Sequence, residues 1–420
     1  MVDLRRGIIR IGDKQGLFGY IHDFTLLAMY FAICFLNNGK TLNTLAHYTI
    51  FGAFCLVTAI DITRQIYYEH RYKIPLSLIW YGLFTVFAVA SYAWAINPES
   101  VIQRFKMLLE VLVFSFGVTT YLSTKERLYR FFNIVCTAIT VLGFVLLART
   151  PVSQWLNGFN NNEIIKGLNI NAASQMMTIC VMITFYLAYV EQKKLYYLPM
   201  LFFTAMALFS GSRKAFLMVG LAFILIIVLN FGKKKYFLNL CMIIGAVIVI
   251  CIAVFKIPTL YDVIGYRMES MIEHYVLGVE SDTSLWQRGM YIKKGWEYFM
   301  DSPFVGNGLN NFGHLFKETG IYGAYAHNNF IELLSGVGIV GFILYYWFHI
   351  YLIINLGIMV FKKHKIAILG FTYMIIFTVF EYGIVSYYDR FLASIVCMSF
   401  VILSMLKTED ENRFGLRGRM

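Results

Sequence analysis

Long apolar runs recur from one end of the chain to the other, and they restrict the possible folds more than any other feature. Runs of about 17–25 apolar residues have the length of a helix that crosses a lipid bilayer. Only 14% of the 420 residues are charged, whereas a soluble domain usually has about 25%. A soluble fold would lack the polar residues needed to cover its surface. The chain is therefore predicted to be an all-α polytopic membrane protein.

The apolar runs predict about twelve transmembrane helices. They lie at 22–37, 44–60, 76–96, 107–122, 131–148, 172–190, 196–212, 214–231, 236–255, 328–360, 366–388 and 391–406. The run at 328–360 is too long for one straight crossing, so we expect an interfacial first turn or a kink near Gly336, Gly338 and Gly341. No small-residue cleavage site follows the first run, which argues against a cleavable signal peptide.

Basic residues are unevenly distributed between the two sides of the membrane. With a cytoplasmic N-terminus, the predicted inside segments hold 22 of the 36 Lys and Arg residues. The predicted outside segments hold the other 14 Lys and Arg residues, and 6 of these lie in the segment 256–329. Long loops are translocated largely regardless of their charge, so these 6 residues count little toward the orientation. This bias places both termini in the cytoplasm. The run Lys233–Lys235 then lies against anionic lipid, so the net charge of +12 is not interpreted as a nucleic-acid-binding surface.

The segment 256–329 is the longest polar stretch, and we expect it to be a partly helical external loop, because long structureless loops are uncommon. Met290–Met300 has helical spacing of apolar residues, and Ser302-Pro303 ends that helix. The predicted organisation comprises transmembrane helices 1–9 with an outer turn at 211–214 (1–255), the external periplasmic or extracellular loop (256–329), transmembrane helices 10–12 (330–406) and a cytoplasmic tail (407–420).

A histidine lies where this loop ends and an apolar helix begins, within Ala326–Glu332 (AHNNFIE). With a reference pKa of about 6.5, a histidine is largely neutral at external pH and can act as a general base. His327 can equally be a structural residue that caps the helix. Asn328 or Asn329 can supply the N-cap. Glu332 either lies in the first turn because the positive end of the helix dipole favours an acidic residue there, or it orients His327.

Two arginines and one buried acid are further candidates. Arg213 stands in a very short outer turn, against the inside bias of positive charge. It either binds an anion or snorkels to the membrane surface. Arg288, just before the loop helix, either binds an anion as well or is an ordinary loop arginine. Glu381, within an apolar run, is costly to bury and therefore a functional candidate.

The sequence lacks the motifs of several common metal and nucleotide sites. There is no phosphate-binding glycine-rich loop, no HExxH motif and no DxD-like acidic cluster, and the seven cysteines all fall within apolar runs. We therefore infer no metal, no nucleotide and no other cofactor.

Taken together, these positions resemble the O-antigen ligase and polymerase superfamily of bacterial surface-glycan enzymes, most specifically over about 200–345. One departure is Lys214, where the family commonly has a small residue; it either adds a cation or has no role. The matching motifs are Ser212-Arg213, Arg288 followed by Asp301–Gly308 (DSPFVGNG), His327-Asn328 followed by Gly336, Gly338 and Gly341, and more weakly 91–98 (SYAWAINP).

The resemblance implies a GT-C-like membrane glycosyltransferase in the bacterial plasma membrane. Its donor would be a glycan on undecaprenyl diphosphate at the outer face, and the product O-antigen or capsular polysaccharide. Chain-length regulator and flippase proteins would be its partners. By resemblance, Arg213 and Arg288 bind the diphosphate, His327 acts on the acceptor hydroxyl, and the anomeric centre is inverted. Lys214, Asn328, Glu332 and Glu381 would support them.

Physical chemistry agrees with this assignment. The planar guanidinium fork of arginine matches a diphosphate, and two such groups can stabilise the leaving group without a metal ion. A polymerase is favoured over a ligase that transfers the glycan to lipid A–core, because the external loop is rich in aromatic residues that suit sugars. A lipid-linked oligosaccharide flippase is the rival from another class, but it should show related halves and a charged central cavity.

Overall fold

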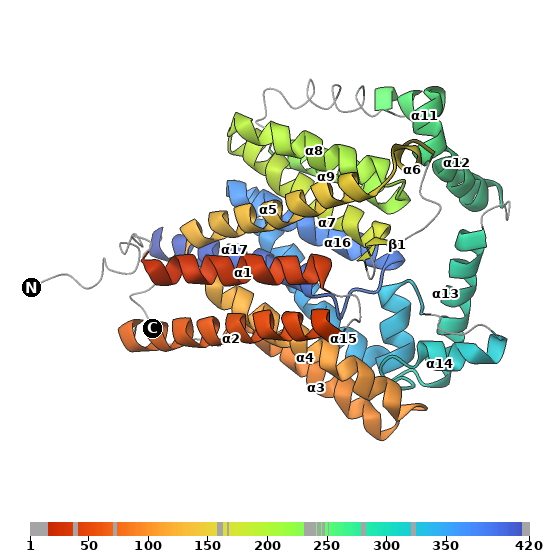
Figure 1. Cartoon of the computed structure of the whole chain (residues 1–420). Helices are drawn as coiled ribbons and strands as arrows, with labels where there is room; N and C mark the ends of the chain where they lie inside the picture. The colour runs from red at the N-terminus through yellow and green to blue at the C-terminus, as the bar shows by residue number, and fades with distance from the viewer. Residues whose placement is uncertain are drawn as a thin grey trace, which may run out of the picture.

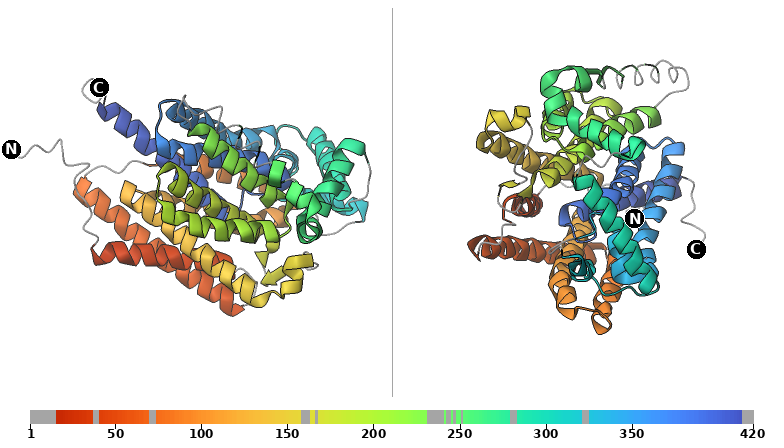
Figure 2. Two further views of the ribbon diagram at one scale, coloured as in Figure 1. Left: turned by 90° about the horizontal axis from the view of Figure 1, so that it is seen from above. Right: turned by 90° about the vertical axis from the view of Figure 1, so that its right-hand side faces the viewer.

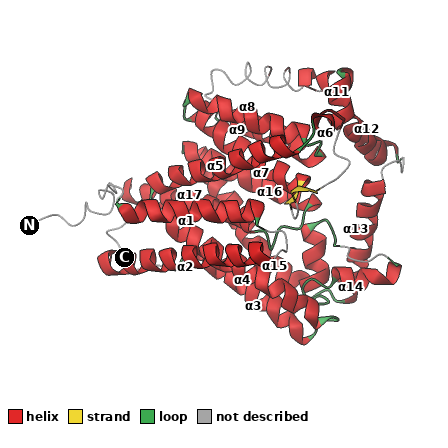
Figure 3. Ribbon diagram, viewed as in Figure 1, coloured by secondary structure: helices red, strands yellow, loops and turns green. Residues whose placement is uncertain are grey.

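The protein folds almost entirely into helices, drawn in red in Figure 3. The computed structural model describes residues 16–36, 41–69, 74–157, 163–165, 168–230, 241, 245, 248–250, 252–278, 283–320 and 325–413. Among these residues the only strands are a short antiparallel pair, β1 (Glu163–Ile165) and β2 (Leu168–Asn169). Apart from this pair, the predicted all-helical class is confirmed for the part of the chain that the structure describes.

The helices follow the predicted apolar runs, and several extend beyond them. The first half contains α1 (Leu17–Phe35), α2 (Thr41–Glu69), α3 (Leu76–Ala90), η2 (Ser91–Ala93), α4 (Pro98–Tyr121), α5 (Lys125–Arg149), α6 (Val152–Asn157), α7 (Ile170–Phe185), η3 (Tyr186–Val190), η4 (Lys194–Tyr196), α8 (Tyr197–Phe209) and α9 (Arg213–Leu229). The second half contains α11 (Pro258–Leu260), η6 (Tyr261–Gly265), α12 (Tyr266–Ile272), η7 (Glu273–Leu277), α13 (Thr283–Asp301), α14 (Phe312–Phe316), η8 (Lys317–Thr319), α15 (Asn329–Phe361), α16 (Lys365–Phe380), η9 (Glu381–Gly383) and α17 (Arg390–Arg413). Most of the helix predicted at 236–255 lies outside the described residues.

Eight helices among the described residues are long and apolar enough to cross a membrane. They are Leu17–Phe35, Asn43–Tyr67, Leu76–Ala93, Lys125–Arg149, Ile170–Val190, Asn329–Phe361, Lys365–Gly383 and Arg390–Glu411. Their number indicates a multi-pass membrane protein. A count of about twelve stays a prediction, because α4, α8 and α9 are not among the eight.

The two ends of the helix bundle differ in what covers them. In Figure 1, α1 begins and α17 ends at the left, whereas α11, α12, α13 and α14 lie across the right-hand end. The right-hand panel of Figure 2 looks onto that covered end. A continuous buried cluster, which includes Trp80, Phe114 and Phe348, joins the helices of the bundle. The residues predicted to carry chemistry lie at the covered end.

Helix α15 is broken at Gly338, where a loop enters it. Gly338 has φ 64° and ψ −170°, a conformation that a side chain would strain. The amides of Ile339 and Val340 on the far side of the break bond to the carbonyls of Pro303 and Phe304, at 2.8 and 3.2 Å. The predicted kink in this helix is therefore confirmed, and its cause is the 303–308 loop rather than the membrane boundary.

The same loop is held on its other side by the end of α3. The indole of Trp94 donates to the carbonyl of Val305 at 3.2 Å, and the amide of Ile96 donates to that of Asn307 at 3.1 Å. The Ser91 hydroxyl accepts from the amide of Leu309 at 2.9 Å. Two stretches singled out by the sequence, 91–98 and 301–308, thus contact each other directly.

Candidate functional site at the covered end of the bundle

His327 stands in a backbone conformation that few side chains adopt. Its φ is 52°, in the left-handed region, where histidine is more common than most residues. Both neighbours are anchored. The Glu332 carboxylate accepts from the amide of Ala326 at 2.9 Å, and the Asn328 side chain caps α15 by accepting from the amide of Ile331 at 3.1 Å. Of the two N-caps considered, Asn328 is the one used, and Glu332 orients the backbone before His327 rather than its ring.

The imidazole ring of His327 lies against two tyrosines. Its centroid is 3.7 Å from that of Tyr325 and 5.8 Å from that of Tyr291, with which it stacks nearly parallel. No hydrogen bond fixes its ring nitrogens within the described residues. Burial lowers the pKa of His327 to about 4, and the positive charges of Arg288 and Lys214 add to this shift. The ring is therefore neutral at physiological pH and can accept a proton.

The short turn before α9 supplies two cations. Ser212 is the N-cap of α9. The Arg213 guanidinium donates to the carbonyl of Arg267 at 3.3 Å, and Arg267 donates in return to the carbonyl of Gly211 at 3.2 Å. The Lys214 ammonium donates to the carbonyl of Gly383. The bonds between Arg213 and Arg267 hold the turn against α12, and the bond from Lys214 holds it against η9.

Lys214 lies in the same cluster of charges as both predicted arginines. Burial lowers its pKa to about 7, followed by repulsion from Arg288 and then from Arg213. A cation held beside two others favours the binding of an anion, because an anion relieves the repulsion. The unusual lysine of the sequence therefore lies beside both arginines, and its role as a further cation stays a prediction.

Arg288 is positioned by the packing of α13 on the start of α15. The contact is so close at Gly295 that a Cβ there would lie 2.2 Å from the Ile331 side chain. Around it is a separate buried cluster formed by Tyr291, Tyr298, Phe312, Phe316, Ala326 and Ile331. Since Ala326 and Ile331 flank His327, this cluster fixes Arg288 and His327 relative to each other. The helix predicted at 290–300 is confirmed, and it begins earlier, so that Arg288 is in its second turn.

Glu381 does not reach His327 but supports the helix behind it. The Glu381 carboxylate accepts from the Asn329 amide at 3.0 Å and from the Ser386 hydroxyl at 2.5 Å. The Asn329 side chain also accepts from the amide of Ser386 at 3.0 Å. This fully buried network ties the first residue of α15 to the segment that follows η9. Glu381 therefore acts on the site through Asn329.

The four residues His327, Arg213, Lys214 and Arg288 thus form one cluster, called here the cation cluster. It combines a neutral base with three positive side chains. Among the residues that the structure describes, no three His, Cys, Asp or Glu side chains come together as a metal site. Three cations beside a base are suited to an anionic leaving group.

Residues 198–346 match the O-antigen ligase family. No curated protein matches the chain significantly. The family match runs from α8 into α15 and contains the whole cation cluster, together with Asn328 and Glu332. The predicted resemblance to the O-antigen ligase and polymerase superfamily is thereby confirmed over this segment. It supports a general enzymatic role with lipid-linked glycan substrates in a membrane.

One arginine of the site lies outside the family match and was not singled out in the sequence. Arg104 of α4 donates from Nε and Nη2 to the Asn310 side chain at 3.1 and 2.5 Å. Its guanidinium lies 3.8 Å from the ring centroid of Tyr388, and its charge interacts with that of Glu332. The available signal was only its place shortly after the 91–98 motif, because other charged and polar residues surround it in the sequence.

Proposed function

We propose that the protein is a membrane glycosyltransferase that polymerises oligosaccharide repeat units linked to undecaprenyl diphosphate. The observation that carries this proposal is a neutral histidine whose ring forms no hydrogen bond within the described residues, beside three cations at one end of a membrane bundle. The family match supports the same chemistry. The product would be O-antigen or capsular polysaccharide.

The three cations would bind the donor diphosphate. Arg213 and Arg288 can each offer two parallel N–H groups to phosphate oxygens. Lys214 adds a point charge, and its pKa is lowered to about 7 by burial and by the two neighbouring arginines. As the sugar–phosphate bond breaks, negative charge grows on the departing diphosphate, and these positive groups stabilise it without a metal ion.

His327 would act as the general base on the acceptor. The acceptor hydroxyl loses its proton to an imidazole nitrogen while its oxygen bonds to the anomeric carbon. The bond from that carbon to the phosphate oxygen breaks, and lipid diphosphate leaves with the electron pair. Attack opposite the leaving group inverts the anomeric centre. Because the pKa of His327 is lowered to about 4, the ring is free to take this proton.

The distribution of charge supports an outward-facing site. The positive-inside bias places the termini in the cytoplasm, and the cation cluster lies at the end of the bundle away from the start of α1 and the end of α17 (Figure 1). We therefore place the site on the periplasmic or exterior face of a bacterial plasma membrane. The division into 1–255, 256–329, 330–406 and 407–420 remains part of this proposal.

The choice of polymerase rests on aromatic side chains near the site. Trp286, Trp296 and Tyr325 are each about half exposed, at 43%, 50% and 43%, and aromatic faces suit sugar rings. Tyr291, Tyr298, Phe312 and Phe316, in contrast, are buried in the core of the 283–316 segment. O-antigen ligase activity is the second candidate, and the description of the matched family favours it.

The deciding experiment uses purified protein and a lipid-diphosphate-linked repeat unit. A ladder of products from this substrate alone would establish a polymerase. Product formed only after addition of lipid A–core would establish a ligase. No transfer in either reaction would contradict a glycosyltransferase, and movement of the lipid-linked unit across vesicles would then support a flippase. His327→Ala provides the inactive control.

A further inference from the structure

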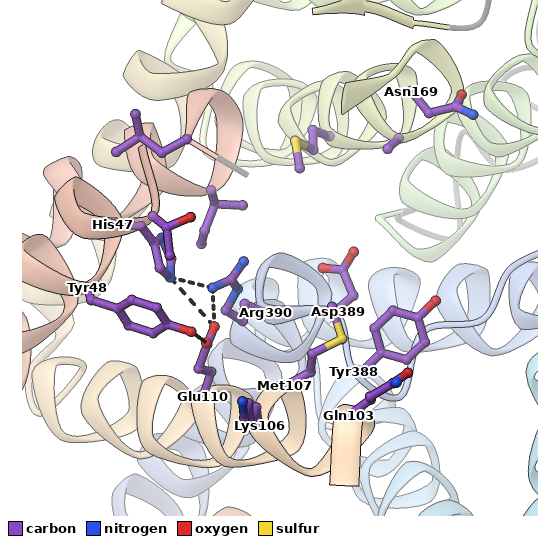
Figure 4. Close-up of a pocket in the computed structure, with 15 residues that line it drawn as sticks. His47, Tyr48, Gln103, Lys106, Met107, Glu110, Asn169, Tyr388, Asp389 and Arg390 are labelled. Carbon is purple, nitrogen blue, oxygen red and sulfur yellow. Dashed lines mark hydrogen bonds and ion pairs between the residues drawn. The ribbon is translucent and has the colours of Figure 1, made fainter. Parts of the chain in front are cut away.

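A second polar site lies outside the cation cluster and outside the family match. It is a cavity of about 610 Å³ bounded by α1, α2, α4, α7 and the start of α17 (Figure 4). Its wall includes Tyr388, the same tyrosine that stacks on Arg104 at 3.8 Å. A cavity of this size is within the usual range for small-ligand sites, about 300–1,000 Å³.

One wall of the cavity is held by a bonded group of side chains. Glu110 accepts from Arg390 and, at 3.0 Å, from the Tyr48 hydroxyl. His47 lies 2.7 Å from the same Arg390 nitrogen and 3.6 Å from Glu110. Arg390 therefore pairs with Glu110. Because these groups bind one another, their polar faces are fixed before any ligand arrives.

Other polar groups of the wall have donors to spare. Within the described residues, no hydrogen bond or ion pair engages the side chains of Gln103 or Lys106. The Asn169 oxygen caps α7 by accepting from the amide of Asn171 at 2.8 Å, which leaves its amide N–H groups to a ligand. Figure 4 shows Asn169 across the cavity from Gln103.

The charges of this cavity are balanced. Two carboxylates, Glu110 and Asp389, face two cations, Lys106 and Arg390. The cation cluster, in contrast, has three positive side chains around a neutral ring. A balanced wall of carboxylate, amide, phenol and ammonium groups offers donors and acceptors in alternation, as a polyhydroxyl ligand requires. It does not favour a diphosphate.

Tyr388 connects the cavity with His327. Its phenol is near enough to that of Tyr325 to contribute to raising the Tyr325 pKa, and the Tyr325 ring packs at a tilt of 31° against His327. Arg104, stacked on Tyr388, interacts in turn with Glu332, which anchors the backbone before His327. A ligand that fills the cavity would therefore border the side of the cluster on which the base is found.

We propose that this cavity is a carbohydrate-binding subsite that holds uncharged sugar residues of the acceptor glycan beside His327. The inference rests on the proposed glycosyltransferase function and adds where the second substrate binds. Donor and acceptor then occupy different regions, with the diphosphate on the cations and the sugar hydroxyls on Gln103, Lys106 and Asn169.

The test measures binding of the delipidated repeat-unit oligosaccharide, which lacks diphosphate, to the full chain in nanodiscs. The double variant Gln103→Leu/Lys106→Met removes donors that bond to nothing in the described protein, so its fold should persist. We expect its Kd for the oligosaccharide to rise at least about tenfold. Lys293→Met, which alters an exposed lysine of α13, is the matched control and should bind normally, as should His327→Ala. Maltohexaose tests whether any glycan is accepted.

The outcomes separate this inference from the proposed function. Equal oligosaccharide binding by wild type and the double variant, or no binding by either, would overturn the subsite even if transfer is normal. Loss of binding in the double variant, with binding retained in His327→Ala, supports it. If transfer is absent in every variant but binding still depends on Gln103 and Lys106, the subsite stands and the proposed function falls.

Discussion

The cation cluster and the balanced cavity lie at the same end of the bundle, yet their charge patterns are opposite in kind. In the cluster, burial disfavours the charge on Lys214 most, and repulsion from Arg288 and Arg213 adds to the effect. In the cavity, Arg390 is neutralised by Glu110. In the cation cluster, a bound anion would relieve the repulsion between like charges. In the cavity, Arg390 and Glu110 are already paired, so a ligand can gain only hydrogen bonds there. The difference teaches that two neighbouring polar sites at one end of a bundle can select for different ligand charge, an anion in one and an uncharged ligand in the other.

The largest effect is expected at His327, the neutral base within the cation cluster. His327→Ala should lower transfer about 100- to 10,000-fold, since general base catalysis contributes about that much. Donor binding should change little. Product chain length and single-turnover rates measure the effect. His364→Ala, whose histidine pairs with Asp410 at 3.1 Å on another surface, should leave activity normal. Wild-type chain length in His327→Ala would rule out the base assignment.

The next effect tests whether the cluster needs forked cations. Arg213→Lys and Arg288→Lys keep the charge but lose the bidentate geometry, and each should reduce transfer about 100- to 1,000-fold. Arg64→Lys is the control, because Arg64 stacks 4.6 Å over Phe18 far from both regions. Full activity in either cluster variant would show that a point charge is sufficient there.

A smaller effect is expected at the anchor of the His327 backbone. Glu332→Ala leaves the amide of Ala326 without its acceptor, so kcat should fall about 10- to 100-fold through misplacement of the ring. Glu332→Gln should recover most of the loss, because its amide oxygen can still accept that bond. Equal loss in both variants would mean that activity depends on the negative charge of Glu332, which interacts with Arg104.

The smallest effect is a pH dependence of donor binding. Lys214, with a pKa lowered to about 7, is protonated below that pH and loses its charge above it. The donor KM should therefore rise a few-fold, up to about tenfold, between pH 6 and 9. His327 stays neutral across this range, since its pKa is about 4. In Lys214→Met the donor KM should be higher at pH 6 and constant with pH. A flat wild-type profile would contradict the role of Lys214.

Features that depend on neighbouring residues could be predicted from the sequence. An asparagine N-cap at 328 or 329, a kink near Gly336–Gly341 and a helix that ends before Pro303 were expected from local chemistry, and the structure has the cap at Asn328, the break at Gly338 and the helix end at Asp301. The membership of Arg213, Arg288 and His327 in one site came from motif resemblance. The charge of Arg288 acts on both His327 and Lys214, and that of Arg213 acts on Lys214, while their shared role in one site stays a prediction.

Contacts between distant parts of the chain could not be predicted. Arg390 and Glu110 are 280 residues apart, and Arg104 and Asn310 are 206 apart. No periodicity or spacing relates such positions, because their contact depends on how the helices pack. For the same reason Glu381 could be identified as a costly buried acid but not as a partner of Asn329. The cavity is assembled from the ends of five helices and has no sequence motif.

The bond between Lys214 and the carbonyl of Gly383 has a consequence for how the enzyme is made. Lys214 emerges from the ribosome well before residue 383, and Ser386, which engages Asn329, comes later still. The segments that carry Arg213, Arg288 and His327 can all enter the membrane without completing the site. We therefore expect the contacts that hold Lys214 and Asn329 to form only after α16 has been inserted, because Gly383 and Ser386 follow that helix in the chain.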